Sequence, residues 1–167
     1  NLCITKGGIA SSPITWNTNG TVVVDAQQTR NYGLFLATVD YNVIDGFRIM
    51  KAKTDNVHFE NGVKTILQNA WIYDSNVDGI DSTGSSNSNF HQIKNNTIFR
   101  NSGSGIGRDG SGLQLYEWRV IGNMIYANSG STSAINVNTP SVLLQNTVFG
   151  NTGSGIYVNN TVSTNSR

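Results

Sequence analysis

A short motif recurs along this chain and constrains its fold more than any other feature. Each copy has an aliphatic residue, often an Asn three positions later, then an Ile or Val followed by an aromatic residue, and an Asn or Ser at the end. Four clear copies begin at Leu67, Ile93, Val120 and Leu143, and a looser one begins at Ile44. Their central apolar residues are Ile49, Ile72, Ile98, Ile125 and Val148, at successive spacings of 23, 26, 27 and 23 positions. Turn-forming residues interrupt every repeat, which leaves no room for a helix within it.

The repeat predicts a solenoid of short strands. Alternate residues of a strand face inward, so coils stacked on one another bury a continuous apolar column. Asn suits the bends because it tolerates left-handed backbone angles, and stacked Asn amides can bond along the axis. A leucine-rich repeat would need a Leu-x-x-Leu-x-Leu framework, which is absent. A propeller blade would need about 40 residues, which is more than one repeat contains. We therefore expect an all-β, right-handed, single-stranded parallel β-helix of about five to six coils. No helix should exceed two turns, and the five central residues should share one buried column.

The repeat also defines the domain organisation. We expect one β-helix domain over residues 1–167, with a first coil at 1–32, regular coils at 33–160 and a tail at 161–167. The chain is expected to be a segment of a longer protein.

Composition narrows the classes of partner. Charged residues make up 13% of the chain and the net charge is +1, with no basic cluster, so nucleic acid is not an expected partner. No apolar run approaches the roughly 20 residues that span a bilayer, so no membrane insertion is expected. Cys3 is the only cysteine, which excludes an internal disulfide and a cysteine-based metal site.

One face of the predicted solenoid carries polar and aromatic residues outward. Counting back about 12 to 15 positions from a central residue leads to the strand after the Gly bend, and the outward residues of these strands are predicted to be Phe35, Glu60, Asp81, Gln114, Asn136 and Tyr157. Adjacent coils lie about 4.8 Å apart. Glu60 and Asp81 would then be neighbours, with Asp78 at the bend before Asp81. Carboxylates this close repel one another unless a cation or a shared proton relieves them.

The repeat, an Asn-x-Ile-aromatic-x-Asn run followed by Gly-x-Gly-Ile, resembles that of the pectate lyase-like superfamily. This superfamily includes polysaccharide lyases and the carbohydrate-binding and sugar-hydrolase repeat proteins. Residues 4–16 and 20–25 are similar to the first coil of secreted bacterial β-helix proteins, especially the family-nine polysaccharide lyases. The resemblance implies an extracellular or cell-surface protein whose partner is a polysaccharide.

Family-nine lyases hold calcium with an Asp-Asp-Gly-aromatic-Asp motif and a further upstream Asp. Residues 77–81, Val-Asp-Gly-Ile-Asp, are similar. The resemblance implies calcium ligands at Asp78 and Asp81, with Asp74 or Glu60 as the further ligand, and calcium-assisted β-elimination on an acidic polysaccharide. Val77 replaces the first Asp of the motif, and Asp-Gly is equally typical of a plain turn.

Catalysis needs a base, and Gln114 stands where the lyases carry a catalytic Lys. An amide takes no proton near neutral pH. Arg108 is the best-placed remaining candidate, although Arg108 and Asp109 can equally form a solvated pair at a loop tip. Substrate contacts are predicted at Glu60, Gln114, Asn136 and Tyr157.

Two functions remain open at this point. One is a lyase-like, carbohydrate-active β-helix. The other is a non-catalytic structural or adhesive solenoid of a surface or filament, in which the open ends of the β-helix support self-association.

Overall fold

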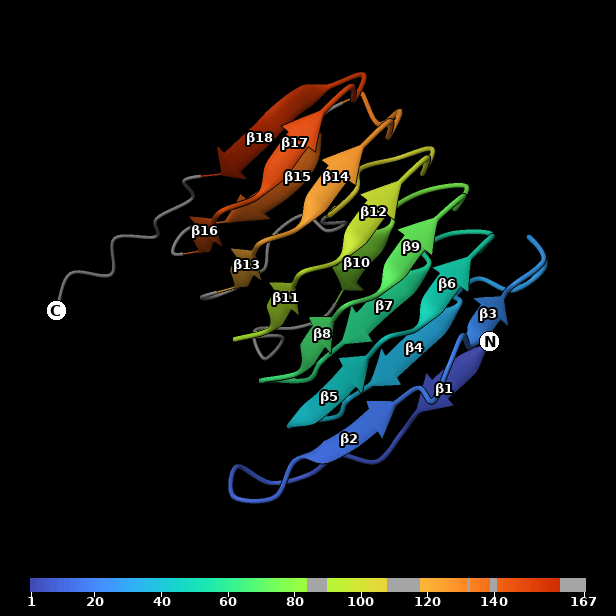
Figure 1. The fold of residues 1–167 in the computed structure, drawn as a ribbon, viewed down its shortest axis with the longest axis vertical. Coiled ribbons are helices and arrows are strands. Elements are labelled where there is room, and N and C mark those ends of the chain that lie inside the picture. Colours follow the sequence, from blue (N-terminus) through green and yellow to red (C-terminus); the bar gives the residue numbers. More distant parts are fainter. Residues whose placement is uncertain (84–89, 108–117, 132, 139–140, 160–167) are drawn as a thin grey trace, which may run out of the picture.

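The computed structural model is a staircase of short parallel strands (Figure 1). It describes residues 1–83, 90–107, 118–131, 133–138 and 141–159. The coils rise from β1 to β18, with about five turns in all. The described residues form no helix, so no helix among them is long and apolar enough to cross a membrane. The predicted all-β solenoid is confirmed.

Three stacks of parallel strands form the walls of the solenoid. The first sheet contains β1 (Leu2–Ile4), β4 (Leu34–Ala37), β7 (Val57–Glu60) and β10 (Ile80–Thr83). Single bridges from Ile106 to Ile80 and to Ile135 link it to β15 (Ser133–Asn138) and β18 (Ser154–Asn159).

The other two sheets have six strands each. The second sheet contains β2 (Ile14–Asn17), β5 (Asn42–Asp45), β8 (Ile66–Gln68), β11 (Gln92–Lys94), β13 (Arg119–Ile121) and β16 (Val142–Leu144). The third contains β3 (Val23–Asp25), β6 (Arg48–Met50), β9 (Trp71–Tyr73), β12 (Thr97–Phe99), β14 (Met124–Tyr126) and β17 (Thr147–Phe149).

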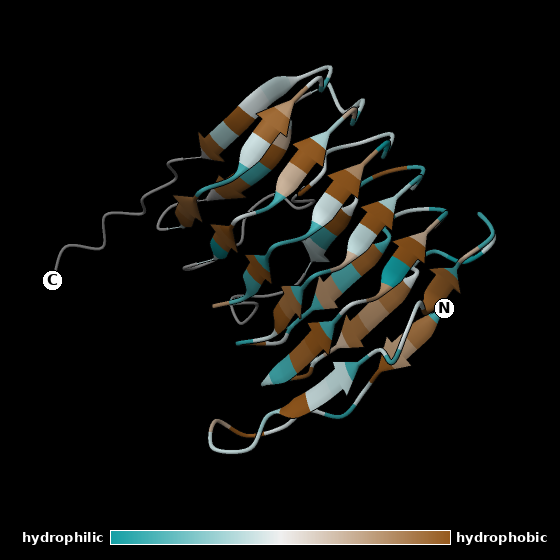
Figure 2. Ribbon diagram, in the orientation of Figure 1, coloured by the Kyte–Doolittle hydropathy of each residue, from teal (hydrophilic) through white to brown (hydrophobic). Residues whose placement is uncertain are grey.

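The predicted apolar column lies in the third sheet. Val24, Ile49, Ile72, Ile98, Ile125 and Val148 are paired in register from coil to coil. The four isoleucines are fully buried. The strands of this sheet carry hydrophobic positions, in brown, in every coil (Figure 2). Stacking of β-branched side chains in one column is therefore a main source of core burial in this fold.

Two ladders of Asn side chains run along the axis inside the turns. In the turn between the second and third sheets, Asn96 donates from Nδ2 to Asn123 Oδ1, and Asn123 to Asn146 Oδ1, each at 3.0 Å. The second ladder, after the third sheet, continues through Asn128 to Asn151. These amides satisfy backbone groups that the tight turns leave without strand partners, as the Asn content predicted.

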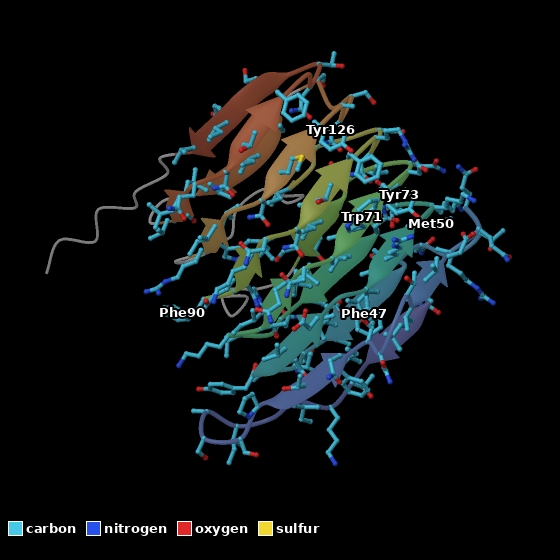
Figure 3. The ribbon with its side chains drawn as sticks, viewed as in Figure 1. Phe47, Met50, Trp71, Tyr73, Phe90 and Tyr126 are labelled. Carbon is cyan, nitrogen blue, oxygen red and sulfur yellow. The ribbon has the colours of Figure 1, made fainter. Side chains whose placement is uncertain are left out.

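A ladder of aromatic rings covers the outer face of the third sheet. Tyr73, Phe99, Tyr126 and Phe149 stack with centroids 5.0, 5.1 and 5.1 Å apart and near-parallel planes. Figure 3 shows Tyr73 and Tyr126 along the same edge of the molecule. Because each inner ring presents its faces to its neighbours, this ladder is mainly a structural element.

Candidate functional site

The outer face of the first sheet gathers an acid–imidazole cluster. Pairing between strands places Phe35 beside His58, and His58 beside Asp81, on successive coils. Glu60 pairs with Ala37 and Thr83 instead. The expected stripe, which put Glu60 next to Asp81, was therefore wrong by two residues. The turns between the sheets differ in length from coil to coil. Counting back from the third sheet therefore gave the wrong register for the first sheet, although it predicted correctly which residues face outward.

His58 is the centre of the cluster. Its Nδ1 atom lies 3.1 Å from Oδ2 of Asp55 and 3.9 Å from Oδ2 of Asp81. Its Nε2 atom lies 2.8 Å from the hydroxyl of Thr83. All three residues are less than 5% exposed. One imidazole nitrogen thus faces two carboxylates, and the other faces a hydroxyl.

The backbone of the next coil holds Asp55 in place. Oδ1 of Asp55 accepts a hydrogen bond from the amide of Asp78 at 3.2 Å, so Oδ2 is left to face His58. Tyr32 covers the imidazole, with its ring stacked on that of His58 at 4.2 Å. Burial, and then the negative charge of Asp55, Asp81 and Glu60, raises the pKa of Tyr32. The Tyr32 hydroxyl therefore stays protonated at neutral pH and can donate a hydrogen bond.

This donor set suits a divalent metal ion. One ligand atom from each of Asp55, His58 and Asp81 lies within 4.8 Å of the others, a span that a shared cation can bridge. Two buried carboxylates beside one imidazole bring negative charge together, which a cation would neutralise. Two carboxylates and one imidazole are common ligands of Zn²⁺ and Mn²⁺, whereas Ca²⁺ prefers oxygen ligands throughout.

Two of the predicted calcium ligands lie in other surroundings. The Asp78 carboxylate accepts a hydrogen bond from the amide of Ser104 and lies against Gly103 and Gly107 of the following coil. Asp74 forms a bidentate ion pair with Arg100 after the third sheet, at 2.7 and 2.8 Å. Of the predicted ligands, only Asp81 belongs to the group of described residues that could hold a metal ion.

The remaining predicted residues fall into two groups. Asn136 and Tyr157 pair on adjacent coils at outward positions of the first sheet, as expected, and Tyr157 is 52% exposed. Arg108 and Gln114 lie outside the described residues, so their roles stay predictions.

Sequence reasoning missed Asp55 and His58. A signal was available: His58 and Asp81 are 23 positions apart, the same spacing that separates Ile49 from Ile72 in these two coils. Applying that spacing to every polar residue would have paired the imidazole with the carboxylate. Asp55 lies 23 positions before Asp78 and so occupies the equivalent bend of the preceding coil, but this spacing does not indicate that its carboxylate turns toward His58.

Comparisons with known proteins agree with this architecture. The family model described as "Right handed beta helix region" matches residues 14–167. The chain belongs to this family. Comparison with curated proteins gives no match.

A solved structure shares the β-helix. The crystal structure of pectate lyase Pel9A aligns with 99% of this chain at a TM-score of 0.71 and 16% sequence identity. The chain spans 42% of the length of that lyase. At this identity the likeness shows only the fold, a right-handed β-helix similar to that of a pectate lyase. The chemistry has to be inferred from the residues of the site.

Proposed function

We propose that this β-helix is an extracellular carbohydrate-active protein that binds an acidic polysaccharide over its first sheet. Asp55, His58 and Asp81 would hold a divalent cation there. The observation that carries the proposal is the buried group of two carboxylates and one imidazole on the outer face of that sheet. The likeness to a pectate lyase fold supports a polysaccharide as the ligand.

The cation explains how such a cluster would serve an acidic ligand. Without it, the two carboxylates would repel a uronate. When bound, a divalent cation supplies the positive charge that attracts a sugar carboxylate and acidifies the neighbouring C–H. The imidazole favours Zn²⁺ or Mn²⁺ over the calcium expected from the sequence.

The rest of the stripe supplies sugar contacts of the usual kinds. Tyr32 and Phe35 stack at 5.1 Å beside the cluster and offer an aromatic surface. Asn136 and Tyr157 lie on the same face two to three coils further on, where an amide and a second ring would contact later sugars of the chain.

Cleavage by β-elimination would be a further step, and it needs a base. Because Tyr32 stays protonated, it suits donation to a leaving oxygen rather than proton abstraction. Arg108 remains the base proposed from the sequence. Without a base, the same face serves the alternative function, a glycan-binding surface solenoid.

Calorimetry with Zn²⁺, Mn²⁺ and Ca²⁺ tests the cation site. We expect the wild type to bind Zn²⁺ or Mn²⁺ more tightly than Ca²⁺, and Asp81→Asn to lose at least about tenfold in affinity, or ~1.4 kcal/mol. Asp74→Asn is the matched control, because Asp74 is paired with Arg100 and should leave cation binding unchanged. Binding that is unaffected by Asp81→Asn would refute the cation site.

Polygalacturonate then tests the ligand. We expect binding in the presence of the cation and weaker binding after chelation. Ultraviolet absorbance of unsaturated products, compared between wild type and Arg108→Ala, tests cleavage. Binding without any product would favour the non-catalytic solenoid.

A further inference from the structure

A separate groove lies on the second sheet and the turns that lead into it. It has a volume of about 390 Å³. Its lining comes from five successive coils and includes Tyr41, Lys64, Ile66, Phe90, Gln92 and Arg119. None of its lining residues belongs to the cluster on the first sheet. Five coils at about 4.8 Å spacing give the groove a length of roughly 19 Å along the solenoid axis.

A column of two rings and an ammonium group forms one wall. Tyr41, Lys64 and Phe90 occupy equivalent positions just before or near the start of β5, β8 and β11. The Lys64 Nζ atom lies 3.2 Å from the Tyr41 hydroxyl and 5.2 and 5.8 Å from the ring centroids of Tyr41 and Phe90. Figure 3 shows Phe90 projecting from the edge of the molecule. These side chains are partly or largely exposed, so a ligand can reach them.

The floor of the groove changes from apolar to polar along the axis. Val43, Ile66, Gln92 and Arg119 are paired in register and face outward on neighbouring coils. The order is therefore two aliphatic side chains, an amide and a guanidinium. Such a floor combines an apolar contact surface with hydrogen-bond donors at one end.

The charge in the groove is positive. Among the described residues that line it, Lys64 and Arg119 are the two cations, and none is a carboxylate. The nearby Asp40 accepts a hydrogen bond from the amide of Val63 at 2.9 Å. Asp45, further along β5, accepts from Gln68 and Asn69 at 2.9 and 2.8 Å. These two carboxylates therefore have partners of their own, and the groove favours an anionic ligand.

The backbone beneath the wall is in an uncommon conformation. Tyr41, Lys64 and Phe90 have φ of 50°, 55° and 62°, in the left-handed region. This conformation is less favourable for a large side chain than for Gly or Asn. In the bends between the second and third sheets, the left-handed positions are occupied by Gly46, Asn69, Asn95 and Gly122. In the wall of the groove, large side chains thus occupy backbone positions that favour Gly or Asn.

We propose that this groove is a second glycan-binding site, which takes a linear carboxylated polysaccharide extended along the solenoid axis. The rings of Tyr41 and Phe90 would contact the apolar faces of sugars. Lys64 and Arg119 would pair with carboxylates, and the Gln92 amide with a hydroxyl. The site is independent of the cation at the first sheet, so it extends the proposed function to another face.

The test measures binding of a galacturonate oligosaccharide in the presence of a chelator, which removes any contribution from the cation. Arg119→Gln and Phe90→Ala are each expected to weaken binding about tenfold. Lys94→Gln is the matched control, since Lys94 faces outward on the same sheet but does not line the groove. The methyl-esterified oligosaccharide, which lacks the negative charge, should bind at least about tenfold more weakly.

Lys64→Asn separates a binding role from a structural one. Asn accepts the left-handed backbone more readily than Lys, so the melting temperature should stay equal or rise while affinity falls about tenfold. Equal affinity of wild type and of the groove variants would overturn the proposal, as would equal affinity for charged and esterified ligands. Asp81→Asn should keep chelator-resistant binding, so a failure of the cation site and a failure of the groove are distinguishable.

Discussion

Asn101 donates from its backbone nitrogen and from Nδ2 to Oδ1 of Asn128, at 3.0 and 2.9 Å. The two residues occupy the same position on consecutive coils, and both are buried. Asn128 in turn donates from Nδ2 to the carbonyl of Ile98 and to Oδ1 of Asn151. Each amide thus links its own coil to those on either side.

The first prediction concerns this ladder. Asn128→Leu should lower the free energy of unfolding by about 3 kcal/mol, because it removes the acceptor of the buried Asn101 backbone N–H and side-chain amide and a donor to the Ile98 carbonyl. Asn151→Leu, in the more exposed last coil, should cost about 1 kcal/mol. Urea denaturation measures both, and equal costs would show that the ladder is not what stabilises the turn.

The second prediction concerns the aromatic ladder. Phe99 is 6% exposed and stacks on both Tyr73 and Tyr126, whereas Phe149 is 52% exposed and stacks on Tyr126 alone. Phe99→Leu should therefore cost about 2 kcal/mol and Phe149→Leu about 0.5 kcal/mol. The two melting temperatures give the comparison, and a larger loss for Phe149→Leu would contradict the prediction.

The third prediction concerns pH. Burial against Phe59 and Trp118 lowers the pKa of His91 to about 4, from 6.5. Between these two values the unfolded chain binds a proton that the folded chain does not. The stability contribution is therefore full above pH 6.5 and declines as pH falls toward 4, by up to about 3 kcal/mol.

His91→Gln removes this titration and can still accept a hydrogen bond from the Thr65 amide, as Nδ1 of His91 does. The free energy of unfolding, measured by denaturant at pH 7 and pH 4.5, should fall less in the variant than in the wild type. An identical fall in both proteins would rule out His91 as the titrating group.

The fourth prediction concerns Asp78, which the sequence suggested as a metal ligand. A methyl group on Gly107 would overlap the Asp78 carboxylate, so Gly107→Ala should cost about 2 kcal/mol. Gly155→Ala is the control, since its Cβ would meet Val148 Cγ1 at an ordinary 3.7 Å. Denaturation of Gly107→Ala in an Asp78→Ala background should show a smaller cost, and an undiminished one would place the clash elsewhere.

Local pattern and period were enough to predict much of this molecule. The spacing of Ile49, Ile72, Ile98, Ile125 and Val148 predicted their shared column, because in a solenoid each coil repeats the environment of the coil before it. The Asn residues at the ends of the repeats predicted amide ladders for the same reason. Alternation also predicted that Asp81, Asn136 and Tyr157 face outward.

Tertiary structure decided which of those outward residues meet. The length of each turn sets the register of the first sheet, and it places His58 rather than Glu60 beside Asp81. Asp55 reaches the imidazole from a turn, and Tyr32 stacks on the imidazole from another turn. A repeat fixes which backbone positions stack, but the length of each turn and the direction of each side chain decide which of the stacked side chains touch.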